Sequence, residues 1–177
     1  MEIQGNIETD NMKLIITDTN VFFDIIEIRA LPEFFALDYE ICTTDFVIHE
    51  ILKSNQKVEV ESFIRAKKLK VIHLNADEVE SVVNFQTKRF LKGITDKTVL
   101  WKSIELKCPL LTGDKKLRKE AEDWGVEVHG SIWVISELIK QLIISNKEGI
   151  ILFEALKMTN GSLPHDIIDK LIKQLKK

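Results

Sequence analysis

Hydrophobic residues follow two alternating periods along the chain. Short, continuous runs rich in β-branched residues are typical of strands that are covered on both faces of a parallel sheet. Such runs occupy residues 14–17, 40–43, 69–74, 110–112 and 126–129. Between them, apolar residues recur at the spacing of amphipathic helices. Short strands that alternate with helices form βαβ units, whose right-handed crossovers place helices on both faces of the sheet. The pattern therefore predicts an α/β fold, a three-layer α/β/α domain around a five-stranded parallel sheet.

Capping residues and helix breakers mark where the predicted helices begin and end. The first helix follows the cap residues Asp18, Thr19 and Asn20. Asp114 begins a later helix, which Gly125 closes in the usual place of a left-handed cap. The other helices expected here start at Asp45 and Thr95, cover about 58–68, run from Asn75 and Asp77 to about Phe90, and span 132–145 behind the cap residue Ser131.

The last part of the chain contains only helical patterns. One helix is expected near 148–158 and another near 165–176, with a break at Gly161 and Pro164. Both are amphipathic, so each leaves an apolar face that needs a partner. We therefore expect an α/β domain over residues 1–146 and a C-terminal helical extension over 147–177. The extension would pack on the same domain or on the partner subunit of a homodimer, and we favour packing on the same domain.

The length and composition indicate the class of protein but say little about its function. The chain has 177 residues, of which 45% are hydrophobic and 30% charged, and this length suits one domain. The net charge of −3 gives no evidence for a simple phosphate-binding coat, although basic clusters occur at 65–70, 88–92 and 115–119. Each cluster could be an ordinary solvated face or a binding site.

Targeting and redox signals indicate a cytoplasmic protein. The chain lacks the roughly 18 consecutive apolar residues that a membrane-spanning helix needs, so we expect no membrane partner. Its first residues lack the basic start and apolar run of a secretory signal. Cys42 and Cys108 lie in apolar runs without a C-x-x-C spacing, which predicts buried free thiols in a reducing cytoplasm.

Acidic residues lie near the carboxyl ends of the predicted strands, at one edge of the sheet. Asp18 follows the first strand and Asp114 the fourth, while Glu50 lies in the helix after the second strand and Asp96 in the first turn of a later helix. Ligands of open parallel sheets bind at this carboxyl edge. Taken singly, each residue could be a helix cap or a solvated helix residue. Together, however, unpaired carboxylates repel one another unless they are protonated or bridged by a cation, and Mg²⁺ or Mn²⁺ fits such oxygen ligands.

Other catalytic arrangements find little support. The sequence contains no G-x-S-x-G, G-x-G-x-x-G or G-x-x-x-x-G-K-[ST] motif. His49 and Glu50 begin no zinc-binding H-E-x-x-H motif, because position 53 is lysine. The start of an aspartyl-phosphate phosphatase would need a second aspartate where Asn20 stands. A metal site built from carboxylates is therefore the leading chemical hypothesis.

Four segments resemble the motifs of the PIN-domain ribonucleases. They are IITDTNV at 15–21, VIHEI at 47–51, Thr95-Asp96, and LTGDKKLR at 111–118. The resemblance covers about residues 13–145 in order. It is closest to the VapC-like toxin ribonucleases of bacterial toxin–antitoxin modules and their near relatives.

This resemblance implies a Mg²⁺- or Mn²⁺-dependent endoribonuclease that acts on single-stranded or structured RNA and has an antitoxin protein as a partner. The residues that match the family's pattern are the four acids Asp18, Glu50, Asp96 and Asp114, which would be catalytic and bind the metal, and the polar supports Asn20 and Thr112. Lys115 and Arg118 would guide the phosphate backbone. Lys115 and Lys116 stand where some members carry a further acid, which leaves open whether one or two metal ions bind.

Two other functions remain open at this point. The chain could be a non-catalytic PIN module that binds RNA or protein as a scaffold, or a metal enzyme that acts on a small phosphate ester. All four carboxylates are retained, which favours the nuclease over the scaffold because a scaffold needs no repulsive cluster. The lack of a phosphate cradle disfavours the small-ester enzyme.

Overall fold

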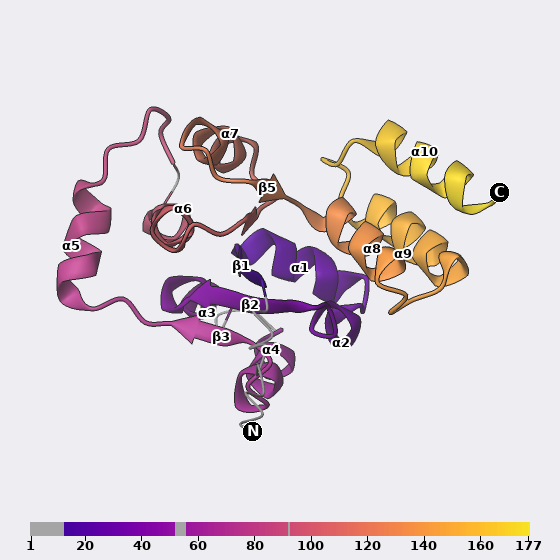
Figure 1. Cartoon of the computed structure of the whole chain (residues 1–177), viewed down its shortest axis with the longest axis horizontal. Helices are drawn as coiled ribbons and strands as arrows, with labels where there is room; N and C mark the ends of the chain where they lie inside the picture. The colour runs from indigo at the N-terminus through magenta and orange to yellow at the C-terminus, as the bar shows by residue number, and fades with distance from the viewer. Residues whose placement is uncertain (1–12, 52–55, 92) are drawn as a thin grey trace, which may run out of the picture.

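The computed structural model describes residues 13–51, 56–91 and 93–177 (Figure 1). Its centre is a parallel sheet with the strand order β3-β2-β1-β4-β5. The strands are β1 (Lys13–Thr17), β2 (Tyr39–Thr44), β3 (Lys70–Ile72), β4 (Leu110–Leu111) and β5 (Val128–His129). The predicted five-stranded parallel sheet is therefore confirmed.

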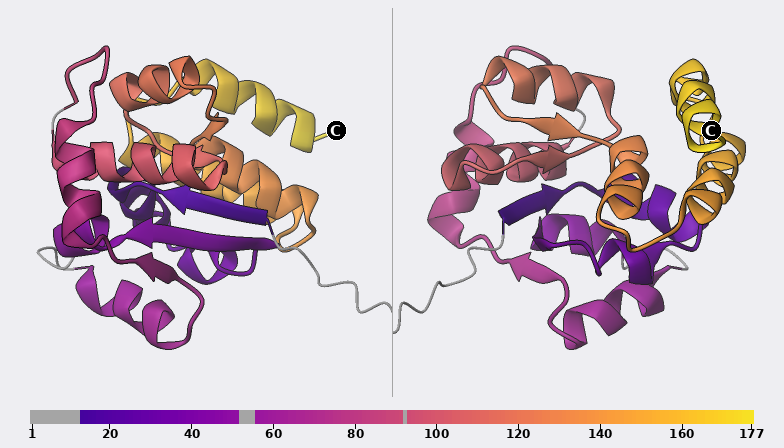
Figure 2. Two further views of the ribbon diagram at one scale, coloured as in Figure 1. Left: turned by 60° about the vertical axis from the view of Figure 1, so that its left-hand side comes forward. Right: turned by 45° about the vertical axis from the view of Figure 1, so that its right-hand side comes forward.

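Helices cover both faces of the sheet, as the alternating pattern predicts (Figures 1 and 2). They are α1 (Thr19–Glu27), α2 (Leu31–Phe34), α3 (Asp45–Ile51), α4 (Lys57–Arg65), α5 (Ala76–Asn84), α6 (Ile94–Leu106), α7 (Lys115–Asp123), α8 (Ser131–Lys140), α9 (Asn146–Thr159) and α10 (His165–Leu175). Helix α6 packs against β1, β2 and β4, whereas α1 contacts α8 and α9 on the other side of the sheet.

The central strand β1 explains why its sequence is a continuous apolar run. Ile15 and Ile16 are neighbours and point to opposite faces, yet they are only 1% and 0% exposed. Ile15 pairs with Ile41 of β2, and Ile16 pairs with Leu110 of β4. Both faces of β1 are thus covered, and this packing fixes the position of the residue that follows the strand at the carboxyl edge of the sheet.

Two predicted helices end more than one helical turn earlier than their patterns indicate. Helix α5 stops at Asn84 rather than near Phe90, because Phe85 turns to an extended conformation and packs on Trp124 with the ring centroids 5.1 Å apart. Helix α8 stops at Lys140 rather than at 145, and the chain turns at Leu142, whose φ is 58°. Tertiary packing and a turn thus override the local helical pattern.

Further differences concern short or terminal features. Ser131 does not cap α8 but is its first residue, behind Gly130, and its hydroxyl donates a hydrogen bond to Asp24. The four-residue helix α2 was not predicted. Gly125 has a φ of 76° and closes the turn after α7, as the sequence predicts.

The C-terminal helices pack on the same chain. Ser145 and Glu148 form a reciprocal capping box at the start of α9, which contacts α1 and α8, and α10 lies against α9. The large hydrophobic side chains that these two helices bury are Phe153, Leu156, Ile168 and Ile172. The favoured self-packing is therefore observed, while the boundary at residue 146 and the homodimer stay predictions.

Cys42 and Cys108 are free and buried, as expected, and burial raises the pKa of their thiols to about 12 and about 11. In the part of the chain that the structure describes, no helix is long and apolar enough to cross a membrane. The N-terminal segment, in which no secretory signal was found, and Lys92 of the basic cluster lie outside the described residues.

Candidate functional site

The order of the strands identifies the place where a ligand is expected. The chain leaves β1 toward β2 on one side, whereas β4 lies on the other side of β1. Connections from two such neighbouring strands run in opposite directions and leave a crevice at their carboxyl ends. Asp18 follows β1 directly, and Thr112 to Asp114 follow β4.

Asp18 is the buried centre of this edge. Its carboxylate is held by three donors: the Thr19 backbone N–H at 2.8 Å, the Asn20 side-chain amide at 2.7 Å and the Thr112 hydroxyl at 2.9 Å. The residue is only 2% exposed. The pKa of Asp18 is raised to about 7, chiefly by burial and also by the negative charges of Asp96 and Glu50, while the hydrogen bonds from Thr112 and Thr19 oppose the rise. An ionised Asp18 is therefore costly in the metal-free protein.

Glu50 reaches this centre from α3 through two threonine hydroxyls. Its Oε2 accepts a hydrogen bond from Thr19 at 2.8 Å, and its Oε1 accepts one from Thr95 at 2.7 Å. Thr19 begins α1 and Thr95 lies at the start of α6, so the two hydroxyls hold the carboxylate between these helices. Glu50 is thus fixed by the protein rather than a freely solvated helix residue.

Asp96 lies in the first turn of α6, directly after Thr95. It is partly buried, and its charge contributes to the raised pKa of Asp18. The structure therefore brings Asp18, Glu50 and Asp96 into electrostatic contact, although they are far apart in the sequence.

Asp114 joins the site through Thr112 and also caps α7. Its Oδ1 accepts hydrogen bonds from the backbone N–H groups of Lys116 and Leu117, at 2.8 and 2.9 Å. Its own N–H donates to the Thr112 hydroxyl, which in turn donates to Asp18. The capping and the functional interpretations of Asp114 are therefore compatible.

Comparison with known proteins identifies the family. The model of family DUF3368, described as a PIN domain, matches residues 14–177. The chain belongs to the PIN-domain family. The match to this PIN domain includes α9 and α10, which the sequence motifs left outside.

Solved structures resemble this PIN-domain chain at low sequence identity. A PilT N-terminus domain protein from the archaeon Sulfolobus solfataricus P2 is 11% identical, with 71% of this chain and 93% of that chain covered and a TM-score of 0.48. VapBC2 from Rickettsia felis, bound to a DNA fragment from its promoter, is 16% identical, with 66% and 98% covered and a TM-score of 0.44. The chain matches no curated protein.

The donor set of this PIN domain suits a hard divalent cation. Among the described residues, no three carboxylate, imidazole or thiol groups are already arranged to hold a metal ion. However, the groups that converge here offer only oxygen ligands. Within the same described residues, Asp18 forms no ion pair with a basic side chain, so its buried charge lacks compensation. Oxygen ligands with uncompensated negative charge fit Mg²⁺ or Mn²⁺.

Asn20 and Thr112 contact the acids Asp18 and Asp114 through hydrogen bonds. Asn20 donates to Asp18 through Nδ2 and accepts the N–H of Gly113 through Oδ1, at 2.7 Å. A Cβ at position 113 would lie 3.2 Å from that Oδ1, so the close approach suits glycine. Asn20 thereby ties the loop after β4 to the loop after β1.

Arg118 has a different place from the one that the motif suggests. Its guanidinium donates to the backbone carbonyl oxygens of Thr112, at 3.0 Å, and Val128, at 3.1 Å. These bonds hold α7 against the ends of β4 and β5 and leave the guanidinium turned toward the protein. Lys115, in contrast, is exposed on α7.

Thr19 and Thr95 are the site residues that the sequence analysis missed. Each is directly adjacent to a predicted acid, in the pairs Asp18-Thr19 and Thr95-Asp96. The signal in the sequence that could have identified them is a hydroxyl residue next to a carboxylate in two of the motifs. Only the fold, however, reveals that both hydroxyls bind the same Glu50 side chain.

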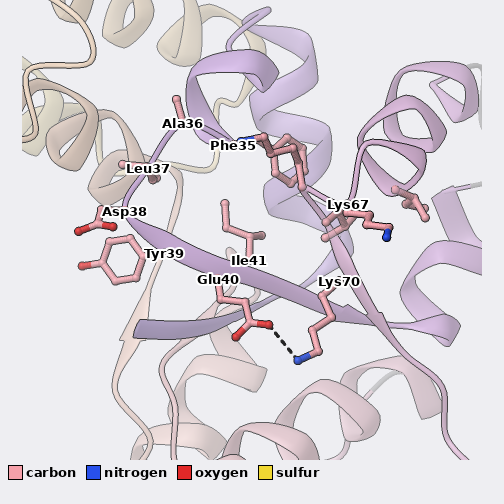
Figure 3. Close-up of a pocket in the computed structure, with 12 residues that line it drawn as sticks. Phe35, Ala36, Leu37, Asp38, Tyr39, Glu40, Ile41, Lys67 and Lys70 are labelled. Carbon is pink, nitrogen blue, oxygen red and sulfur yellow. Dashed lines mark hydrogen bonds and ion pairs between the residues drawn. The ribbon is translucent and has the colours of Figure 1, made fainter. Parts of the chain in front are cut away.

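A cavity lies away from these acids. It has a volume of about 610 Å³ and lies at the amino ends of β2 and β3. Figure 3 shows Glu40 and Lys70 in its lining, where their side chains form an ion pair at 2.9 Å. Because this cavity is at the opposite edge of the sheet from Asp18, we do not assign the family's chemistry to it.

Proposed function

We propose that this PIN-domain protein is a Mg²⁺- or Mn²⁺-dependent endoribonuclease of the toxin type. The observation that carries the proposal is the buried, uncompensated carboxylate of Asp18 beside Glu50 and Asp96 at the carboxyl edge of the sheet. Stability alone favours no such cluster, because the charges of Asp96 and Glu50 raise the cost of ionising Asp18. A site that binds a cation gives the cluster a function.

The side chains would divide the work according to their positions. Asp18 and Asp114 would bind the metal directly, Asp96 would bind it directly or through water, and Glu50 would bind it through water or orient the attacking water. When bound, the cation lowers the pKa of a water molecule and neutralises the charge that grows on the attacking and leaving oxygens of the phosphodiester.

The polar groups around the acids would keep their geometry fixed between turnovers. Thr19 and Thr95 hold both oxygens of Glu50, and Thr112 links Asp18 to the backbone of Asp114. Such preorganisation places the carboxylates before substrate arrives, so the reaction does not have to reorganise them. Lys115 would attract the phosphate backbone from the exposed side of α7.

A toxin of this kind would act on RNA in the cytoplasm and would need a protein antitoxin to restrain it. We also propose a homodimer as its assembly. A gene for a small antitoxin-like protein beside this gene would support the toxin assignment. Co-expression with that neighbour should relieve growth inhibition by this chain, whereas continued inhibition would contradict the pairing.

The decisive test is RNA cleavage by the purified full chain, with Mn²⁺ or with EDTA. Asp18→Asn and Asp114→Asn should each lower the Mn²⁺-dependent rate by orders of magnitude, because residues that act as one unit lose most of the activity singly. Asp38→Asn, the same chemical change at an exposed residue at the amino end of β2, should leave the rate unchanged. Undiminished cleavage by Asp18→Asn would refute the nuclease assignment at this site.

One observation favours an alternative, a non-catalytic PIN module that binds RNA or protein as a scaffold. As noted above, the described residues hold no ready-made group of three metal-binding side chains. The same assay separates the two functions. A scaffold would bind RNA without any Mn²⁺-dependent cleavage, and its affinity would not depend on Asp18.

A further inference from the structure

A basic pocket with an exposed aromatic ring lies beside the acidic site. It has a volume of about 390 Å³ and is lined by Arg89, Phe90, Lys115, Lys116 and Lys119. Segment 85–91, which follows α5, runs next to α7 in both views (Figures 1 and 2). No acidic side chain is part of this lining. The pocket is therefore strongly positive, although the whole chain has a net charge of −3.

The loop that carries Phe90 is anchored. The fully buried carboxylate of Glu120 accepts the backbone N–H groups of Lys88 and Arg89, at 2.9 and 3.0 Å. The Arg89 side chain also binds Glu120 and Asp123. Nevertheless the ring of Phe90 is 80% exposed. The anchored loop thus holds a large apolar ring in solvent at the rim of a cationic pocket.

The charges of α7 are arranged against the stability of the helix. Lys115 and Lys116 occupy its first turn, directly after the cap residue Asp114, where the positive end of the helix dipole favours acids over lysines. Within the described residues, Lys115, Lys116 and Lys119 form no ion pair. A local arrangement that costs stability is expected at functional sites. Here it places two unpaired ammonium groups in the first turn of α7 and that of Lys119 about one turn further along, and together the three attract anions.

We propose that this pocket binds single-stranded RNA, with phosphates on Lys115, Lys116 and Lys119 and a base stacked on Phe90. The inference rests on the proposed nuclease function, because Asp114 directly precedes Lys115 and a strand bound in the pocket leads to the acids. Stacking on an aromatic ring needs an unpaired base, which a duplex does not offer. An acidic peptide would use the lysines but would leave the ring without a role.

The test measures binding, so it does not depend on catalysis. Fluorescence anisotropy follows a short labelled oligouridylate with the full chain in EDTA, over a series of salt concentrations. Phe90→Leu, which keeps an apolar side chain, should weaken binding about tenfold, as expected for the loss of one stacked base. Phe90→Trp should bind at least as tightly as the parent. Met158→Ala, at an exposed residue of α9, is the matched control and should have no effect.

The lysines should affect a different parameter. Each of Lys115→Ala, Lys116→Ala and Lys119→Ala should reduce the slope of log affinity against log salt by about 0.7, the value for one phosphate contact on a single strand. Phe90→Leu should leave that slope unchanged. Lys147→Ala, at an exposed lysine of α9, should change neither slope nor affinity.

The outcomes separate this site from the nuclease assignment. Unchanged RNA binding in Phe90→Leu and in the lysine variants would overturn the pocket, even if Mn²⁺-dependent cleavage is found. Predicted binding effects without any cleavage would support the pocket and contradict the nuclease. A competition experiment with a polyglutamate peptide tests for an acidic partner. If the peptide displaces RNA equally well from the parent and from Phe90→Leu, and if that variant keeps its RNA affinity, the pocket is a docking site for an acidic partner instead.

Discussion

At the scale of single residues, Asp18 combines two properties that usually exclude each other. It accepts the Thr19 N–H at the start of α1, as a capping residue does, yet its pKa is raised from 3.8 to about 7. A pure cap has no reason for such a rise, since hydrogen bonds from N–H and O–H donors lower the pKa of a carboxyl group. The rise comes from burial beside other carboxylates, and it makes the metal-free protein sensitive to pH.

The sign of this sensitivity follows from linkage. Between about pH 4 and pH 7 the folded chain keeps a proton on Asp18 that the unfolded chain has lost, so the free energy of unfolding should fall as the pH rises. Each pKa unit corresponds to about 1.4 kcal/mol, so the contribution of Asp18 amounts to a few kcal/mol. In EDTA at neutral pH, Asp18→Asn should therefore melt at or above the parent, and its stability should lose this part of the pH dependence. Urea unfolding of both proteins between pH 4 and pH 8 checks this. A variant about 1 kcal/mol less stable than the parent, with the same pH profile, would mean that Asp18 is only a cap.

A bound cation should make the parent more stable than Asp18→Asn. Binding to the folded state alone adds about 2.7 kcal/mol when the ion is at 100 times its dissociation constant. Millimolar Mn²⁺ or Mg²⁺ should therefore raise the melting temperature of the parent, and the gain should shrink in Asp18→Asn but persist in Asp38→Asn. Thermal melts with EDTA and with each metal give the comparison. A parent that is indifferent to both metals would count against the metal site.

At the scale of secondary-structure elements, the sequence predicts the regular parts of the fold well. The apolar runs predict each strand of the observed sheet, because strands covered on both faces need little but hydrophobic β-branched residues. The four acids could be proposed as a site for a similar reason, since topology brings the carboxyl ends of parallel strands together. The end of α5 could not be found this way. It depends on Trp124 and Glu120, which are distant in sequence and bind Phe85 and the backbone after it.

The contact between α1, α8 and α9 was also invisible in the sequence. Asp24 of α1 accepts the Ser131 hydroxyl at 2.5 Å and the side-chain amide of Asn160 at 2.9 Å. Ser131 begins α8 and Asn160 is the cap residue that follows α9, so one carboxylate joins three helices. No local pattern marks this role, because residues 24, 131 and 160 meet only in the folded chain.

Removal of the Asp24 carboxylate should loosen these helices. Asp24→Ala leaves the partly buried partners Ser131 and Asn160 without their acceptor, which typically costs about 1–3 kcal/mol. Chemical denaturation should show this loss, whereas Asp38→Ala at an exposed position should change stability little. The effects of Asp24→Ala and Asn160→Ala should not add, because both remove the same hydrogen bond. Additive effects would mean that the two side chains act independently.

At the scale of the whole molecule, the C-terminal helices are part of the packed structure. Phe153 and Leu156 of α9 are 1% and 0% exposed and belong to the same hydrophobic core as the sheet. Ile168 and Ile172 of α10 join that core from the next layer. The chain itself therefore covers much of the apolar stripes that the sequence left without a partner, while Ile151 and Ile167 stay exposed.

Two truncations should separate the contributions of these helices. A chain that ends after Ser145 exposes the surface beneath Phe153 and Leu156, each worth about 1.5–3 kcal/mol of burial, and it loses the bond from Asn160 to Asp24. It should melt well below the full chain or aggregate, because the uncovered faces of α1 and α8 are apolar. A chain that ends after Asn160 keeps α9 and should lose less, mainly the burial of Ile168 and Ile172. Thermal melts and size-exclusion chromatography of the three chains test both the ranking and the predicted division at residue 146. If the chain that ends after Ser145 is as stable, as soluble and as oligomeric as the full protein, residues 147–177 are a separate appendage and the packing seen here does not stabilise the PIN domain.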